Sequence, residues 1–311
     1  MKKRSFIEPF LVAAALSSAA AMVQPARAET YDVEMPSGTN YDHASFRLWL
    51  PEDVEMARAV LVLVPGSNGD GRDQVETPFW QQLAARHQLA LIGVYFTDKQ
   101  HEDMFIEHYI EVSKGSGQTF LDAVTRLGEM AGHSELANAP LLLWGMSAGG
   151  EFNYELALWK PERVMGFVVN KGGIYYSSLA SKEARQVPGL FFIGENDLAF
   201  RNDIIRGIYS INRRARALWA LMEEPDVAHE VACSRAMAAL FYEELIALRL
   251  PDASGSPTLR ALKLSDGFVC DPSSNRCTEA ADVPERRYPT AWLPTENLAN
   301  AWRAVTTGAP F

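Results

Sequence analysis

The sequence predicts an α/β protein, a single domain with a mostly parallel central sheet and helices on both faces. Two observations lead to this prediction. Several strand-like segments, such as 59–64 and 141–144, are continuous apolar runs, which is typical of strands buried on both faces. Segments with helical spacing alternate with these runs along the chain, and this alternation indicates parallel strands joined by helices.

Each expected element follows from its residue pattern. The first strand alternates between polar and apolar residues, and the others are short apolar runs. The expected strands are 44–50, 59–64, 89–96, 141–144, 165–169, 189–193 and 219–222. The expected helices are 77–87, 116–131, 148–159, 201–217, 234–248 and 297–305. Proline marks several helix ends: Pro78 follows a Thr77 cap, and Pro161 and Pro251 follow two helices.

The first 28 residues have the pattern of a cleaved signal peptide. A basic head at residues 2–4 precedes an apolar stretch at 11–23, and small residues at 26–28 fit a cleavage site. The apolar stretch is too short for a typical membrane span of ~20 residues. We therefore expect export to the periplasm or the extracellular space. The alternative is an anchor that stays uncleaved.

Residues 29–311 then form one catalytic domain, with an irregular, turn-rich extension over about 251–311. Cleavage removes four basic residues and one acidic residue, which changes the net charge from −10 to about −13. Such a surface repels polyanions, so we expect no nucleic-acid partner. Nothing after the signal peptide predicts a membrane-spanning helix, and the sequence carries no signal for an oligomeric state.

Three cysteines occur in the chain, Cys233, Cys270 and Cys277. An exported protein can form disulfides, and Cys270 and Cys277 flank a turn-forming cluster. We expect a disulfide between these two, the alternative being two free thiols. Cys233 is then unpaired, and no cysteine spacing fits a zinc site.

A lone serine follows the apolar run 141–144. Residues 145–149, Gly-Met-Ser-Ala-Gly, fit the pattern G-x-S-x-G. In a sharp strand-to-helix turn, glycines two residues before and after the serine avoid collisions with neighbouring backbone, and the serine hydroxyl is raised above the sheet. The buried strand before Ser147 and the expected helix after it supply this context. The alternative is a tight turn without chemistry.

A serine hydroxyl needs a base, and the base needs an acid that orients it. Sites built on this turn have the order serine, acid, histidine along the chain. His229 is the one histidine after Ser147. Asp197, a few residues past the strand 189–193, is the expected acid, and Glu195 and Asp226 are the alternatives.

The developing oxyanion needs backbone N–H donors. One is expected from Ala148, the residue after the nucleophile, and one from the glycine-containing loop 66–69. Ser67 is the preferred donor in this loop and Asn68 the alternative. The loop lacks the Gly-Lys-Ser/Thr ending of a phosphate-binding P-loop.

These features together resemble the α/β-hydrolase superfamily. The resemblance covers roughly residues 44–248 and rests on the strand order, the serine turn 145–149, the acidic turn 194–197 and the histidine turn 228–230. Gly150 and the Pro-Gly-Ser loop 65–67 are similar to its secreted serine esterase and polyester-depolymerase branch. The sequence departs from the family pattern at two places. Ala228 stands before the histidine, where the family usually has glycine, and no histidine precedes the glycine of the loop 65–67.

The resemblance implies hydrolysis of carboxylic esters through an acyl-enzyme, with no cofactor and no metal. The expected partner is a small-molecule or polymeric ester. Four aromatic residues at strand ends are candidates for substrate binding, although they could equally pack in the core: Tyr95, Phe96, Tyr175 and Phe200. The competing functions are a serine peptidase of the same fold and a non-catalytic exported binding protein.

Overall fold

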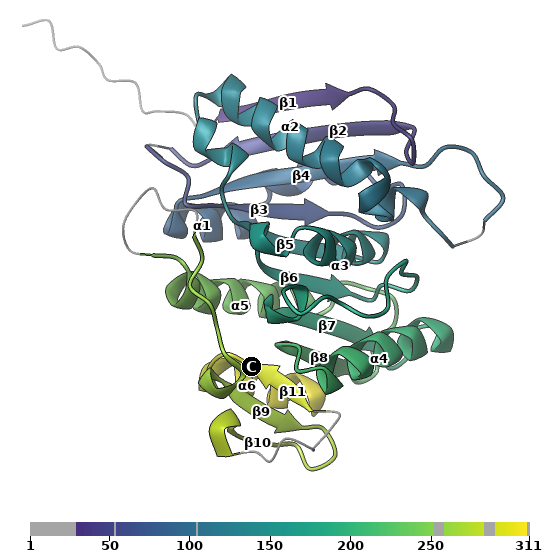
Figure 1. Ribbon diagram of the computed structural model, residues 1–311, viewed down its shortest axis with the longest axis vertical. Helices are drawn as coiled ribbons and strands as arrows, with labels where there is room; N and C mark the ends of the chain where they lie inside the picture. Colours follow the sequence, from purple (N-terminus) through teal and green to yellow (C-terminus); the bar gives the residue numbers. More distant parts are fainter. Residues whose placement is uncertain (1–28, 53, 104, 252–257, 283–289, 310–311) are drawn as a thin grey trace, which may run out of the picture.

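Eight strands form the main sheet, in the order β1-β2-β4-β3-β5-β6-β7-β8 (Figure 1). The computed structural model describes residues 29–309 apart from 53, 104, 252–257 and 283–289, so the expected signal peptide lies outside the described residues. The strands are β1 Glu29–Met35, β2 His43–Leu50, β3 Ala59–Val64, β4 Leu89–Thr97, β5 Leu141–Met146, β6 Val164–Asn170, β7 Gly189–Gly194 and β8 Trp219–Glu224. β2 is antiparallel to β1 and β4, and the strands from β4 to β8 are parallel, which confirms the predicted mostly parallel sheet.

Helices cover both faces of this sheet (Figure 1). The helices on one face are α2 Ser116–Ala131, α3 Ala148–Trp159 and α4 Ala199–Arg214. The helices on the other face are α1 Pro78–His87, α5 Ser234–Arg249 and α6 Glu296–Thr306. The predicted arrangement of helices is confirmed.

The central strands are apolar throughout because both faces of the sheet are covered. In β3, Val60 and Val62 pack in the core on the α2–α3–α4 side, whereas Leu61 and Leu63 pack on the opposite side. All four side chains are fully buried. Successive strand residues point to opposite faces, so a buried parallel strand needs apolar residues at every position.

The predicted and observed elements differ at a few ends. α2 and α3 have the predicted bounds, whereas α4 begins at Ala199 and ends at Arg214, ahead of the prediction at both ends. Thr77 precedes α1 as expected, but its hydroxyl donates to Gln74 O instead of capping the helix. β1 was not predicted, and it lies at the edge of the sheet with Val33 as its one buried residue.

The C-terminal region is more regular than the sequence predicted. Three short strands, β9 Phe268–Asp271, β10 Arg276–Glu279 and β11 Ala291–Leu293, form a second sheet in the order β10-β9-β11. The predicted disulfide is confirmed, since Cys270 and Cys277 are bonded across the β9–β10 pair. The last helix, α6, was expected. The prediction of an irregular extension over about 251–311 did not include these three strands.

No helix in the described ranges combines the length and the apolar character that a membrane crossing requires.

The carboxyl ends of the parallel strands meet at one edge of the main sheet, on the right of Figure 1. The end of β5 pairs with the end of β6, and the ends of β7 and β8 pair through Gly194 and Glu224. The segments that follow β5, β7 and β8 contain Ser147, Asp197 and His229, respectively. Ligand sites in such sheets form at this edge, so these three segments are the expected place for a site.

Candidate active site

Ser147 occupies a strained turn between β5 and α3. Its φ of 54° and ψ of −125° lie outside the regions that non-glycine residues usually adopt. The Ser147 N–H donates to Asn170 O at 2.8 Å, and its carbonyl accepts from Gly150 N at 2.8 Å. The neighbouring strand β6 and the first turn of α3 therefore hold the serine in this conformation.

The glycines of the serine turn allow close backbone approach. A Cβ atom on Gly145 would lie 2.2 Å from Gly149 O. A Cβ atom on Gly149 would lie 2.2 Å from Val64 O and 2.4 Å from Pro65 O, at the end of β3. These contacts agree with the steric role that the sequence pattern assigned to both glycines.

Replacing Gly149 with alanine should destabilise the fold by about 3 kcal/mol or more, because the new methyl group collides with backbone that cannot move as a side chain would. Urea unfolding measures this loss. Gly207→Ala is the matched control, since a Cβ atom at this position in α4 meets nothing within 4 Å. This control should gain about 0.5–1 kcal/mol from the better helix propensity of alanine. Equal stability of the two variants would contradict the steric argument.

Asp197 and His229 form a hydrogen-bonded pair beyond the ends of β7 and β8. His229 Nδ1 lies 2.7 Å from Asp197 Oδ2, and the Asp197 side chain is only 2% exposed. Asp197 Oδ1 also accepts the Leu198 N–H at 2.7 Å, and Asn196 N donates to Val227 O at 2.8 Å between the two segments. A carboxylate that accepts from Nδ1–H leaves Nε2 as the basic nitrogen.

The alternative acids lie elsewhere in these turns. Glu195 is exposed, and its Oε2 accepts the backbone N–H of Asp226 at 3.1 Å. Among the described residues, His229 has no hydrogen bond to Glu195 or to Asp226. Asp197 is therefore the carboxylate that the geometry favours as the partner of the imidazole.

Ser147 Oγ has a neighbour that the sequence analysis missed. Arg201 Nη1, from the first turn of α4, lies 3.4 Å from Ser147 Oγ. Within the described ranges this is the one hydrogen bond of the Ser147 hydroxyl, and none joins it to His229. Hydrogen bonds between catalytic groups commonly tighten only when substrate binds.

The expected oxyanion donors lie beside the serine. A Cβ atom on Gly66 would be 3.6 Å from Ser147 Cβ, which brings the loop 66–69 next to Ser147. Ala148 begins α3, so its N–H has no acceptor inside the helix. Asn68 N points to Tyr109 Oη at 3.4 Å, whereas Ser67 N makes no hydrogen bond within the described residues. This difference favours Ser67 over Asn68.

The segment between β4 and α2 attaches to the loop 66–69. Asp98 N donates to Asn68 Oδ1 at 2.8 Å, and the Asp98 carboxylate accepts the backbone N–H groups of His108 and Tyr109 at 2.9 and 3.0 Å. These contacts join this segment to the expected oxyanion loop.

Two of the aromatic candidates, Tyr95 and Phe96, are neighbours in β4. Phe96 is 2% exposed and stacks on Tyr109 at 5.7 Å between ring centroids, so it is a core residue. Tyr95 points to the other side of β4, where it contacts His43 at 4.8 Å between centroids and lies under the Arg72 guanidinium. Adjacent strand residues face opposite sides of the sheet, so the two rings lie on different faces of β4, and the burial of Phe96 favours the core reading for that residue.

The other two aromatic candidates follow β6 and β7. Tyr175 packs edge-on against Tyr154 with its hydroxyl buried and unpaired, so its ring belongs mainly to the core. Phe200 is 41% exposed, beside the Arg201 guanidinium and 6.4 Å from the Phe105 ring centroid. Phe200 therefore remains the best-placed aromatic candidate for a substrate contact.

α3 carries two buried carboxyl groups that hold the segment after β6. Glu151 Oε1 accepts from Gly173 N at 2.6 Å and from Ile174 N at 3.0 Å. Glu155 Oε1 accepts from Tyr176 N and Ser177 N, both at 2.8 Å. Burial raises the pKa of Glu151 to about 8. The Glu151 carboxyl group is therefore mostly protonated at pH 7.

The raised pKa of Glu151 predicts a pH-dependent stability. The folded protein keeps a proton that the unfolded chain releases above the ordinary pKa of 4.5, so stability falls as pH rises from about 4.5 to 8. Between pH 6 and pH 8, the wild type should lose about 2 kcal/mol of unfolding free energy through Glu151, or roughly 5 °C in Tm, and Glu151→Gln should not show this loss. Thermal unfolding at both pH values measures the difference in Tm, and Glu183→Gln, at an exposed position, is the control. Identical pH profiles for Glu151→Gln and the wild type would refute the assignment.

A buried ion pair supports the segment that carries His229. Lys171 Nζ binds Asn170 Oδ1 at 3.0 Å and forms an ion pair with Glu224, the last residue of β8. The other Glu224 oxygen, Oε1, accepts Cys233 N at 3.0 Å, just before α5. Glu224 and Cys233 lie on either side of His229 in the chain. The Glu224 carboxylate, held by Lys171, therefore fixes both ends of the segment that carries His229.

The sequence analysis missed Arg201, Glu151 and the Lys171–Glu224 pair because charged residues are usually exposed. One signal was present for Glu151. It lies four residues after Ser147, in the first turn of α3. No sequence pattern pointed to Arg201.

One group of side chains in the described ranges could hold a metal ion. Ligand atoms of His101, Asp103 and His108 lie within 4.8 Å of one another. His101 Nε2 is paired with Asp98 at 3.0 Å and His108 Nε2 with Asp103 at 2.9 Å, and the two imidazole rings stack. Both Nε2 atoms are thus engaged by carboxylates, and exposed groups of this kind are common without an ion, so this arrangement assigns no metal.

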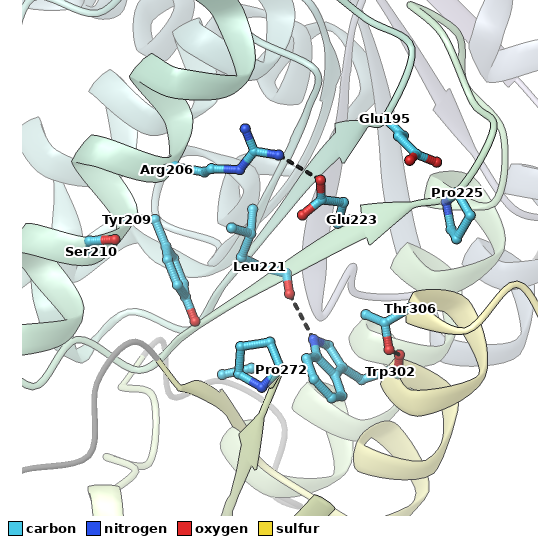
Figure 2. Close-up of a pocket in the computed structure, with 11 residues that line it drawn as sticks. Glu195, Arg206, Tyr209, Ser210, Leu221, Glu223, Pro225, Pro272, Trp302 and Thr306 are labelled. Atoms are coloured by element: carbon cyan, nitrogen blue, oxygen red, sulfur yellow. Dashed lines mark hydrogen bonds and ion pairs between the residues drawn. The ribbon is translucent and has the colours of Figure 1, made fainter. Parts of the chain in front are cut away.

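A cavity of about 490 Å³ lies away from the serine, between α4, β8 and the C-terminal region (Figure 2). Trp302 and Tyr209 form part of its wall, and the Arg206–Glu223 ion pair lies at its edge. Neither Ser147 nor His229 lines it.

Comparison with known proteins supports the fold. No protein-family model matches the chain, and no curated protein matches it significantly. Among solved structures, a ferulic acid esterase is similar with a TM-score of 0.54 and 11% identity, over 70% of this chain and 98% of that chain.

The poly(3-hydroxybutyrate) depolymerase LpqC from Bordetella parapertussis is similar with a TM-score of 0.50 and 19% identity, over 73% of this chain and 92% of that chain. At this level of identity the likeness concerns the fold. It agrees with the fold that the sequence resemblance implied.

Proposed function

We propose that this chain, which has the α/β-hydrolase fold, is a serine hydrolase that cleaves carboxylic esters through an acyl-enzyme. The observation that carries the proposal is the hydrogen bond of 2.7 Å between His229 and the buried Asp197 carboxylate. This pair follows β7 and β8 at the sheet edge where the strained turn displays Ser147.

In the proposed mechanism, His229 Nε2 takes the proton of Ser147 as Oγ attacks the ester carbonyl. The new bond joins Oγ to the carbonyl carbon, and the backbone N–H groups of Ser67 and Ala148 bind the oxyanion. Asp197 keeps Nδ1 protonated and stabilises the imidazolium. His229 then protonates the leaving alcohol as the ester C–O bond breaks.

Water completes the reaction in a second half. His229 removes a proton from water as it attacks the acyl carbonyl, and returns a proton to Ser147 Oγ as the acid leaves. Every proton moves between Ser147, His229, substrate and water. The proposed chemistry therefore proceeds with these side chains and backbone donors.

The proposed substrates are short-chain, aryl or polymeric esters. The names of the two similar structures, a ferulic acid esterase and a poly(3-hydroxybutyrate) depolymerase, fit this class. We also propose that the protein is exported, since the disulfide between Cys270 and Cys277 suits an oxidising compartment.

The experiment compares a p-nitrophenyl ester panel of increasing acyl length with an aminoacyl p-nitroanilide. An esterase should cleave at least one ester with a kcat/KM about 10³-fold or more above that for the anilide. Preference for the anilide would indicate a peptidase. Turnover of neither compound nor of a polymeric ester by folded protein would indicate a binding protein and overturn the proposal.

A further inference from the structure

The Arg201 guanidinium beside the nucleophile lacks a carboxylate partner. Its Nη1 lies 3.4 Å from Ser147 Oγ, and its Nε is buried without a hydrogen-bond partner. No ion pair of Arg201 with a carboxylate occurs among the described residues. Arg206, five residues along the same helix, instead pairs with Glu223. Arg201 therefore presents an uncompensated positive charge at the serine.

The surrounding backbone makes room for this side chain. A Cβ atom on Gly173 would lie 3.1 Å from Arg201 Cγ and 3.5 Å from its Nη1. The glycine therefore lets the arginine extend along the segment after β6 toward Ser147. Phe200 supports the guanidinium from another side, with its ring centroid 5.7 Å from Arg201 Cζ.

The nearby acid leaves this positive charge in place. Glu151 packs against the same glycine: a Cβ atom on Gly173 would lie 3.5 Å from its Oε1. Burial raises the pKa of Glu151 to about 8, although the Arg201 charge acts to lower it. Glu151 is therefore mostly neutral at pH 7, while the guanidinium stays charged.

We propose that Arg201 binds a carboxylate of the substrate, so that the preferred esters carry a carboxylate two or three carbons from the ester group. This inference rests on the proposed ester hydrolysis at Ser147. A reacting carbonyl carbon lies ~3 Å from the nucleophile, and a guanidinium holds a carboxylate oxygen at ~2.8 Å. Nη1 lies 3.4 Å from Oγ, so a carbonyl held at Oγ and a carboxylate held at Nη1 are within reach of a spacer of two or three carbons.

In this scheme the carboxylate does not react. The bond between Oγ and the carbonyl carbon forms, the ester C–O bond breaks, and the proton passes through His229 to the leaving alcohol, as for a neutral ester. Arg201 positions the substrate through a charge-assisted hydrogen bond, which is about twice as strong as a neutral one. The net charge of −10 repels anions from the protein as a whole, so the Arg201 guanidinium supplies the positive charge that an anionic substrate needs beside the serine.

The test compares charged and neutral esters of nearly equal shape, at pH 7.0 in a pH-stat. Ethyl hydrogen succinate is paired with ethyl succinamate, in which an amide replaces the carboxylate on the acyl side. 3-Acetoxypropanoate is paired with 3-acetoxypropanamide, which moves the charge to the alcohol side. The measured quantity is the ratio of kcat/KM for the charged ester to that for its neutral partner.

For the wild type, this ratio should be about tenfold or more in one of the two pairs, the gain expected of a hydrogen bond to a charged group. The pair that shows it identifies the side of the ester on which the carboxylate lies. Arg201→Gln should reduce the ratio to near one or below, mainly through KM for the charged ester. Arg201→Lys should recover part of it.

Arg206→Gln is the matched control, since this arginine lies on the same helix with its own carboxylate partner, and it should keep the wild-type ratio. A wild-type ratio near one in both pairs would overturn the inference, as would an equal loss for both esters in Arg201→Gln. If Arg201→Gln does not fold, succinate should competitively inhibit p-nitrophenyl butyrate hydrolysis by the wild type. A hydrolysis rate that stays unchanged as the succinate concentration is raised contradicts the inference.

The results also separate this inference from the proposed function. If the neutral esters are cleaved without any preference for charge, ester hydrolysis at Ser147 stands and only the inference fails. If no ester is cleaved, both the inference and the proposed function fail.

Discussion

Replacing Ser147 with alanine is expected to lower kcat for p-nitrophenyl butyrate by about 10³-fold or more. In the proposed mechanism this serine oxygen forms the acyl-enzyme, and without it only the slower direct attack of water on the ester remains. The φ of 54° at Ser147 is set by its neighbours, and alanine at this position keeps the same Cβ atom. Thermal unfolding of the variant should therefore match the wild type.

This pairing of lost activity with retained stability is the informative result. A variant that loses both would report only that the turn needs serine for folding. A well-folded Ser147→Ala protein with more than about a tenth of the wild-type kcat would contradict the assignment of the nucleophile.

Replacing Asp197 with asparagine is expected to lower kcat by about 10⁴-fold. An amide can donate to Nδ1, and the imidazole then takes the tautomer in which Nε2 carries the proton and cannot act as a base. The loss should appear in kcat for neutral and charged esters alike, since Asp197 acts through His229.

Glu195→Gln is the matched control for Asp197→Asn. Both acids lie in the turn after β7, but Glu195 is exposed and binds the backbone of Asp226 rather than the imidazole. The kcat of Glu195→Gln should stay within about twofold of the wild type. A large decrease of kcat in Glu195→Gln together with a small decrease in Asp197→Asn would reverse the assignment of the acid.

The central part of the fold was predictable because its local signals agree. The apolar run of β5 gives way to Gly145, and the helical pattern of α3 starts directly after Ser147. The contacts of Gly145 and Gly149 with neighbouring backbone follow from the same pattern. The Asp197–His229 contact was also predictable, because the carboxyl ends of adjacent parallel strands meet at one edge.

Elements at the periphery carried weaker signals. β1 is an edge strand with a largely exposed sequence, so its apolar pattern is faint. β9, β10 and β11 have three or four residues each, and β9 and β11 pair across a long stretch of chain. Such short strands depend on tertiary packing more than on local propensity.

The electrostatics of the site could not be read from the chain. Lys171 and Glu224 are 53 residues apart, yet their side chains are 0% and 4% exposed and form an ion pair. Arg201 reaches Ser147 from a different helix, through space that Gly173 leaves open. These contacts arise from the three-dimensional arrangement of strand ends, which a residue pattern along one segment does not encode.

The most direct test of the proposed nucleophile is labelling with a fluorophosphonate, followed by intact mass measurement and peptide mapping. We predict one adduct per folded chain, located on Ser147, and little labelling of His229→Ala in the same time because its serine lacks a base. Folded wild-type protein that stays unlabelled, or that carries the adduct on another residue while Ser147 remains free, would contradict the proposed serine hydrolase.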